Sequence, residues 1–137
     1  MVNNLYRCIL VSILFFFSAP GLSWQPEGSE VDLSQREYLL PAEAAAFQDE
    51  DVIYLDVRST LEWLGGHVEG AVHLPYDEVA DEIASVLPDR SVPVIAYCGS
   101  GPRASFVIDE MRKQGYTVVP VVKGGYRELI ENGMKKD

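Results

Sequence analysis

The residues with the clearest chemical potential form one short stretch, from Cys98 to Arg103, which reads Cys-Gly-Ser-Gly-Pro-Arg. Glycines at positions 99 and 101 let the backbone curl, so that several N–H groups point inward and form a nest for an anion. We expect a helix to begin at Pro102 or Arg103, which brings its positive end to the same hollow. Arg103 adds a full charge there, and a cysteine at the rim would have a stabilised thiolate. The stretch therefore predicts a nucleophilic sulfur over a pocket for an oxyanion.

Strands and helices alternate along the chain, and this pattern puts the stretch 98–103 directly after a predicted strand. Apolar runs predict strands over residues 37–40, 52–57, 71–74, 92–97 and 117–122, and helices are expected over 42–48, 59–64, 77–87, 103–114 and 126–131. This alternation favours an α/β fold, with a parallel sheet covered by helices on both faces. The active crevice of such folds lies beyond the carboxyl ends of the strands, where Cys98 follows the strand 92–97.

Local signals define several of these elements. Ser59 and Glu62 fit a capping box at the start of a helix. Asp77 is expected to cap the helix that ends at Leu87, with residues 79, 83, 86 and 87 on its buried face. Pro120 lacks an N–H, so the strand 117–122 is expected at a sheet edge or with a bulge.

Composition narrows the class of protein. The chain has 137 residues, 47% of them hydrophobic, which suits one globular domain and disfavours a mainly disordered chain. It carries 11 Lys and Arg against 21 Asp and Glu, a net charge of −10, which disfavours general nucleic-acid binding. No apolar run reaches the roughly 20 residues of an ordinary transmembrane helix.

The N-terminus has the pattern of a secretory signal peptide. Arg7 precedes an apolar run over residues 8–17, and small residues at 21 and 23 suit cleavage before Trp24. We expect a signal peptide over residues 1–23, a flexible leader over 24–36 and a single domain over 37–134, in a periplasmic protein. The alternatives are a buried helix or a short membrane anchor. Cleavage leaves Cys98 as the only cysteine, either a functional thiol or an inert, buried one.

The spacing from Cys98 to Arg103 separates two enzyme classes. Cysteine phosphatases use C-x5-R, whereas this chain has C-x4-R, and a shorter loop leaves less room for a phosphate. The chain resembles a single-domain rhodanese of the exported type. The resemblance rests on residues 56–58 with Glu62, on residues 66–75, on residues 97–103 and on residues 124–126.

The resemblance implies a five-stranded parallel sheet and a thiosulfate sulfurtransferase. Cys98 would be the catalytic nucleophile, which takes the outer sulfur of the donor as a persulfide and passes it to cyanide or a thiol. The substrate-binding residues would be Gly99, Ser100, Gly101, Pro102 and Arg103, the last on the sulfonate oxygens. No cofactor or metal is required. The loop also resembles that of mercaptopyruvate sulfurtransferases, so mercaptopyruvate is a second candidate donor.

Other interpretations stay open at this point. A rhodanese-like module could deliver sulfur to a protein partner with little turnover, and a cysteine phosphatase or arsenate reductase is a weaker alternative. Asp56 and Arg58 follow a strand and are expected to form a structural pair near the pocket. His67 is expected to be a hydrogen-bonded loop histidine, because no second His or Cys lies at metal-ligand spacing.

Overall fold

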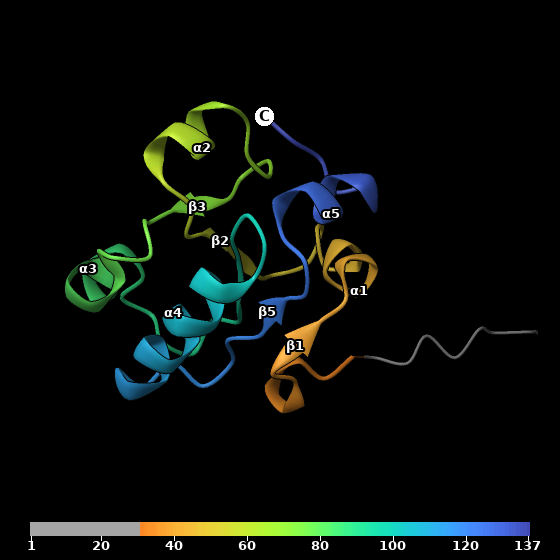
Figure 1. Ribbon diagram of the computed structural model, residues 1–137. Helices are drawn as coiled ribbons and strands as arrows, with labels where there is room; N and C mark the ends of the chain where they lie inside the picture. Colours follow the sequence, from red (N-terminus) through yellow and green to blue (C-terminus); the bar gives the residue numbers. More distant parts are fainter. Residues whose placement is uncertain (1–30) are drawn as a thin grey trace, which may run out of the picture.

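The computed structural model describes residues 31–137, and Figure 1 shows the arrangement of their helices and strands. In chain order the elements are a 3-10 helix (Leu33–Gln35), β1 (Tyr38–Leu39), α1 (Pro41–Ala46), β2 (Ile53–Asp56), α2 (Thr60–Leu64), β3 (Val72–His73), α3 (Val79–Val86), β4 (Val94–Tyr97), α4 (Pro102–Lys113), β5 (Val121–Val122) and α5 (Tyr126–Glu131). The predicted signal peptide lies outside the described residues.

The five strands form one sheet in the order β1-β5-β4-β2-β3, and every neighbouring pair is parallel. The centre of the sheet is the pairing of β2 with β4, whose register aligns Asp56 with Tyr97. The predicted five-stranded parallel sheet is therefore confirmed. The carboxyl ends of β2 and β4 lie side by side, which brings Asp56 and Arg58 into the neighbourhood of Cys98.

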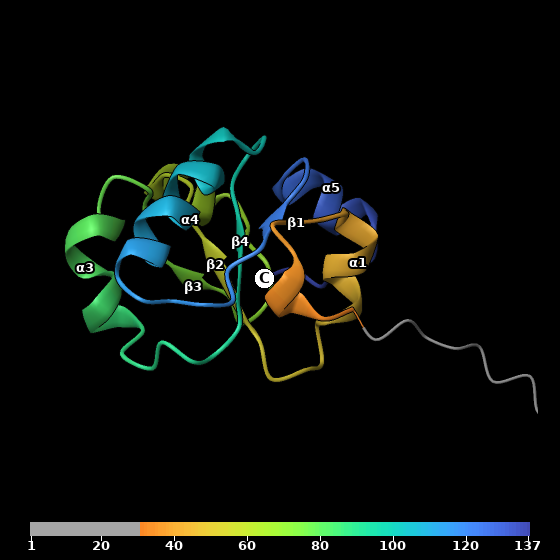
Figure 2. The same cartoon turned by 90° about the horizontal axis from the view of Figure 1, so that it is seen from below.

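Helices cover both faces of the sheet, as predicted (Figure 2). Because side chains alternate along a strand, the three inner strands β2, β4 and β5 contribute to both cores. One core joins α3 and α4 to side chains of the sheet that include Leu55, Ala96 and Val121. The other joins α1 and α5 to side chains that include Tyr54, Ile95 and Val122.

Two local predictions were wrong. β5 is not at an edge, because it lies between β1 and β4. The strand is shorter than expected and begins after Pro120, whose carbonyl still accepts the Ala96 N–H at 3.0 Å, so no N–H of Pro120 is needed. α3 begins at Val79 with Glu78 as its N-cap, so Asp77 is not the cap, and Val86 is exposed.

Packed structure begins before residue 37, the expected first residue of the domain. Leu33 is buried in the 3-10 helix and packs in the core beneath α1 and α5. Asp32 caps this helix by accepting the Ser34 N–H at 2.9 Å. The last six residues of the predicted leader therefore include packed structure. Within residues 31–137, no helix has the length and apolar character needed to cross a membrane.

A close backbone contact links the start of α5 to the loop after β4. Tyr126 donates its N–H to the carbonyl of Cys98 at 2.8 Å. A Cβ added at Gly125 would lie 2.5 Å from that carbonyl oxygen and closer still to the carbonyl of Gly99. Both neighbours are backbone atoms, so the glycine is required for the loop to sit where it does.

Gly125→Ala is therefore expected to destabilise the fold by about 1–3 kcal/mol, because the added methyl group forces the Cys98 loop away from α5. Urea unfolding monitored by circular dichroism measures this change. Gly65→Ala is the matched control, since its Cβ would meet only ordinary contacts at 3.4 Å or more. Equal unfolding free energies for the two variants would contradict the packing argument.

Candidate active site

The loop after β4 turns into α4 at the predicted place, and one of its N–H groups meets the sulfur of Cys98. Gly101 has φ of 109°, a conformation that favours glycine, and it turns the chain into α4 at Pro102. The Gly101 N–H donates to Sγ of Cys98 at 2.9 Å. A donated N–H at the first turn of a helix stabilises negative charge on the sulfur.

The thiol is not at the rim of an open hollow, which corrects the prediction. Cys98 has 0% exposure and belongs to the core that also contains Val57 and Ala104. The loop outside it is more accessible: Ser100 and Pro102 are exposed, and Arg103 is half-buried. Cys98 directly follows β4, and its side chain packs in this core while its Sγ accepts the N–H of Gly101 from its own loop.

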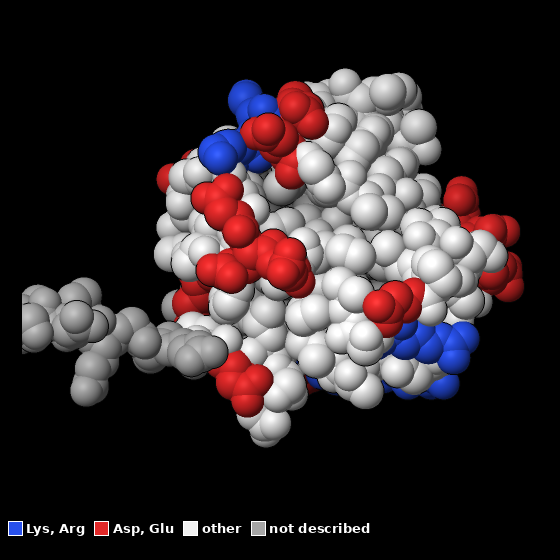
Figure 3. All heavy atoms as spheres, turned by 180° about the vertical axis from the view of Figure 1, so that it is seen from behind, with Lys and Arg blue, Asp and Glu red and all other residues white. Residues whose placement is uncertain are grey.

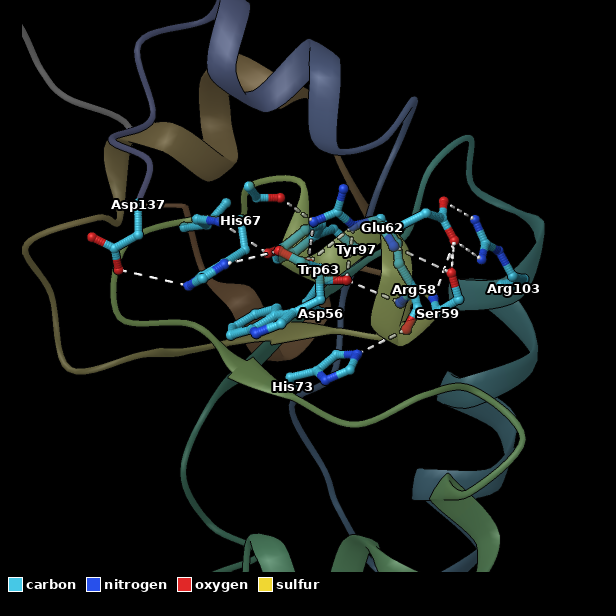
Figure 4. Close-up of polar contacts among 12 residues, drawn as sticks. Asp56, Arg58, Ser59, Glu62, Trp63, His67, His73, Tyr97, Arg103 and Asp137 are labelled. Carbon is cyan, nitrogen blue, oxygen red and sulfur yellow. Dashed lines mark hydrogen bonds and ion pairs between the residues drawn. The ribbon is translucent and has the colours of Figure 1, made fainter.

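Arg103 and Glu62 form a two-pronged ion pair beside this loop. Nη1 and Nη2 of Arg103 donate to the two carboxylate oxygens of Glu62 at 2.7 and 2.8 Å. The side chains approach one another from the start of α4 and from α2, as Figure 4 shows. The guanidinium of Arg103 lowers the pKa of Glu62 to about 2, and Ser59 contributes further hydrogen bonds. In turn, Glu62 above all, and then Cys98, raises the pKa of Arg103.

Asp56 and Arg58 form the expected pair, and it is buried. Nε and Nη2 of Arg58 donate to the carboxylate of Asp56 at 2.6–2.9 Å, and Nη2 also donates to the carbonyl of Gly66. The guanidinium lies 4.0 Å from the ring centre of Tyr126. Although burial works against its charge, hydrogen bonds to Asp56 raise the pKa of Arg58. This pair joins the ends of β2, the loop before β3 and α5.

His67 is a hydrogen-bonded loop histidine, as predicted. Its ring stacks on Trp63 with centroids 3.5 Å apart, and Nδ1 lies 3.2 Å from the Trp63 carbonyl. His73 stacks on Trp63 at 4.7 Å, and its Nε2 lies 3.0 Å from the carbonyl of Arg58 (Figure 4). The two histidines therefore hold α2 against β3.

The structure brings together Cys98, Arg103 and the backbone of the loop, with the Asp56–Arg58 pair at the carboxyl end of the neighbouring strand β2. Glu62 was predicted as part of a capping box, which it does form with Ser59, and as one of the residues that carry the family resemblance, but it was not assigned to the site. Its bond to Arg103 was missed, because a contact over 41 positions leaves no periodic signal in the sequence. The assignment of residues 99–103 to substrate binding stays a prediction.

Comparison with known proteins identifies a family and similar proteins. The sequence model of one family, the rhodanese-like domain, matches residues 40–132. The thiosulfate sulfurtransferase PspE of Escherichia coli is 32% identical over 76 residues, which cover 56% of this chain and 72% of that protein. A tRNA uridine(34) hydroxylase of Chlamydia pneumoniae is 32% identical over 107 residues, 72% of this chain but only 33% of the hydroxylase.

Solved structures agree on the fold. The solution structure of a rhodanese-like domain from Anabaena has a TM-score of 0.68 with this chain, at 21% identity. The match covers 74% of this chain and 79% of that domain. At this identity the likeness concerns the fold alone.

Proposed function

This chain belongs to the rhodanese-like domain family, and from that premise we propose that it is a thiosulfate sulfurtransferase that works through a persulfide on Cys98. The sulfurtransferase class has support from the relatives named above. The observation that carries the proposal is the sulfur of Cys98 at the carboxyl end of β4, bonded to the Gly101 N–H at the start of α4. This is where a parallel α/β fold places its reactive groups.

The reaction proceeds in two half-reactions. The Cys98 thiolate attacks the outer sulfur of thiosulfate, the S–S bond of thiosulfate breaks, and sulfite leaves with the bonding electron pair. Cys98 then carries the transferred sulfur as a persulfide anion. Cyanide or an acceptor thiolate then attacks that outer sulfur, and the S–S bond of the persulfide breaks. The acceptor leaves as thiocyanate or as a new persulfide, and Cys98 returns to its thiolate form.

Arg103 is the group best placed to meet an anionic donor. A guanidinium has five N–H donors, and Glu62 engages one on each of two nitrogens. The remaining donors can hold the sulfonate oxygens of the donor and the departing sulfite. Because Cys98 is fully covered in the resting structure, the donor enters only when its loop or the Glu62–Arg103 pair moves aside.

Initial-rate kinetics test the proposal. With thiosulfate and cyanide both varied, the two half-reactions predict parallel lines in double-reciprocal plots of thiocyanate formation. Intersecting lines would require both substrates on the enzyme at once and would contradict a free persulfide intermediate. Absence of thiocyanate formation would contradict the activity itself.

Arg103→Ala is expected to lower kcat/KM for thiosulfate by about 2–4 kcal/mol in transition-state terms, because a charge aimed at the departing sulfite is lost. Arg103→Lys is expected to keep a kcat/KM for thiosulfate between those of Arg103→Ala and the wild type, since lysine keeps the charge but not the planar, two-pronged geometry. Steady-state rates for both variants measure the effect. Unchanged rates in Arg103→Ala would remove this residue from the proposed site.

A second candidate function is a sulfur carrier that serves a protein partner. The fully buried thiol of Cys98 favours it, because a partner that opens the loop would be needed for transfer. Slow thiocyanate formation with rapid transfer to one protein would support the carrier, whereas rapid turnover of thiosulfate alone would support the enzyme.

We further propose that the protein is exported to the periplasm. The support is the N-terminal pattern of Arg7, an apolar run and small residues before Trp24. N-terminal sequencing of the protein recovered from a periplasmic fraction tests both export and the cleavage position. The donor would be thiosulfate or mercaptopyruvate, and the acceptor cyanide, a small thiol or a protein thiol.

A further inference from the structure

The carboxylate of Glu62 is held more firmly than an ordinary surface side chain. It accepts the N–H of Ser59 at 3.1 Å and the hydroxyl of Ser59 at 2.8 Å, besides its two bonds to Arg103. Its position at the third residue of α2 follows from the capping box. Glu62 is therefore fixed in place before any donor arrives.

This ion pair lies directly against the loop that carries the nucleophile. A Cβ built on Gly99 would lie 2.9 Å from Nη2 of Arg103 and 3.1 Å from Oε1 of Glu62. The side chains of Arg103 and Glu62 are 31% and 38% exposed, whereas Cys98 beside them is fully buried. The pair therefore stands between solvent and the part of the loop nearest the thiol.

The pair has no net charge at neutral pH, because the pKa of Glu62 is lowered to about 2 and Arg103 stays protonated. The guanidinium of Arg103 beside Cys98 is thus already neutralised by a carboxylate. The net charge of the whole chain is −10, which gives no positive long-range field to attract an anionic donor. Acidic side chains are also spread over the opposite face of the molecule, seen from behind in Figure 3. A donor with two negative charges must either displace Glu62 or bind next to it.

We infer that Glu62 is a specificity-determining residue that makes the site prefer sulfur donors with a single negative charge, of the thiosulfonate class, over the dianion thiosulfate. The inference rests on the proposed function. With a thiosulfonate, the Cys98 thiolate takes the outer sulfur, the S–S bond of the donor breaks, and a sulfinate leaves with the electron pair. One charge less on the donor means less repulsion from the fixed carboxylate.

The test compares two donors in three proteins. The donors are thiosulfate and methanethiosulfonate, each assayed with cyanide, and the proteins are the wild type, Glu62→Gln and Glu43→Gln. Glu43 is a close match for Glu62: it pairs with Arg36 through both oxygens at 2.8 Å and accepts the N-cap N–H of α1. Glu43 follows the edge strand β1, which lies two strands away from β4. Glu43→Gln removes one negative charge from the protein, as Glu62→Gln does, but far from the Cys98 loop.

Glu62→Gln is expected to raise kcat/KM for thiosulfate about tenfold, mainly through KM, and to change the value for methanethiosulfonate by less than about threefold. Glu43→Gln is expected to leave the ratio between the donors unchanged. Three results would each overturn the inference. They are an unchanged ratio of kcat/KM between the two donors in Glu62→Gln, the same change of this ratio in Glu43→Gln as in Glu62→Gln, and an equal loss of kcat/KM with both donors in Glu62→Gln. If the wild type transfers sulfur from neither donor, the proposed function fails, and the selectivity with it.

Discussion

Cys98→Ser is expected to lower kcat for thiocyanate formation by more than about a thousandfold, because the proposed mechanism passes through one sulfur atom. A serine hydroxyl keeps the size of the side chain and can still accept the Gly101 N–H. It is nevertheless a poor nucleophile at neutral pH, and the charged side chain beside it, Arg103, is a protonated guanidinium that cannot act as its base. The loss would therefore be chemical rather than structural.

Steady-state assays at saturating thiosulfate and cyanide measure this loss. The unfolding free energy of the variant is the control, and we expect a loss of about 1–3 kcal/mol, because the change buries a hydroxyl in an apolar core while the protein still folds. A folded Cys98→Ser protein that keeps more than a tenth of the activity would contradict covalent catalysis at this residue.

Asp56→Ala is expected to destabilise the protein by about 3–5 kcal/mol, because it leaves the charge of Arg58 buried without its partner. Asp56 is 0% exposed and Arg58 is 4% exposed, so water cannot replace the lost carboxylate. The same carboxylate also accepts the backbone N–H of Arg58 at 2.9 Å. The loss therefore affects the turn after β2 as well as the guanidinium.

Chemical denaturation of Asp56→Ala against the wild type measures this change. Glu43→Ala is the control, because it removes the carboxylate of a partly exposed ion pair with Arg36 and should destabilise the protein clearly less than Asp56→Ala. Equal losses for the two variants would show that burial of the Asp56–Arg58 pair does not determine its importance.

Much of the fold follows from local sequence signals. The periodic apolar residues of α4, the capping box at Ser59 and the glycine pair before α5 placed their helices correctly, because each signal acts over only a few residues. The alternation of elements was enough to predict a parallel sheet with both faces covered. Pro120 was misleading because a proline restricts only its own position, and a strand that starts one residue later can still occupy the middle of the sheet.

The site was predicted less completely than the fold. The turn through Gly101 and the start of α4 follow from the residue types, and so does the amide directed at the sulfur. The burial of Cys98 depends on the core that also holds Val57 and Ala104, and the bond between Glu62 and Arg103 depends on how α2 approaches the start of α4. That packing brings together residues far apart in the chain, and no local pattern encodes it.

Intact-mass spectrometry of the mature protein after incubation with thiosulfate tests the persulfide most directly. After removal of excess donor, we expect a gain of one sulfur atom per chain, which cyanide removes and which Cys98→Ser does not acquire. An unmodified wild-type mass, or a gain that persists in Cys98→Ser, would contradict sulfur transfer through Cys98.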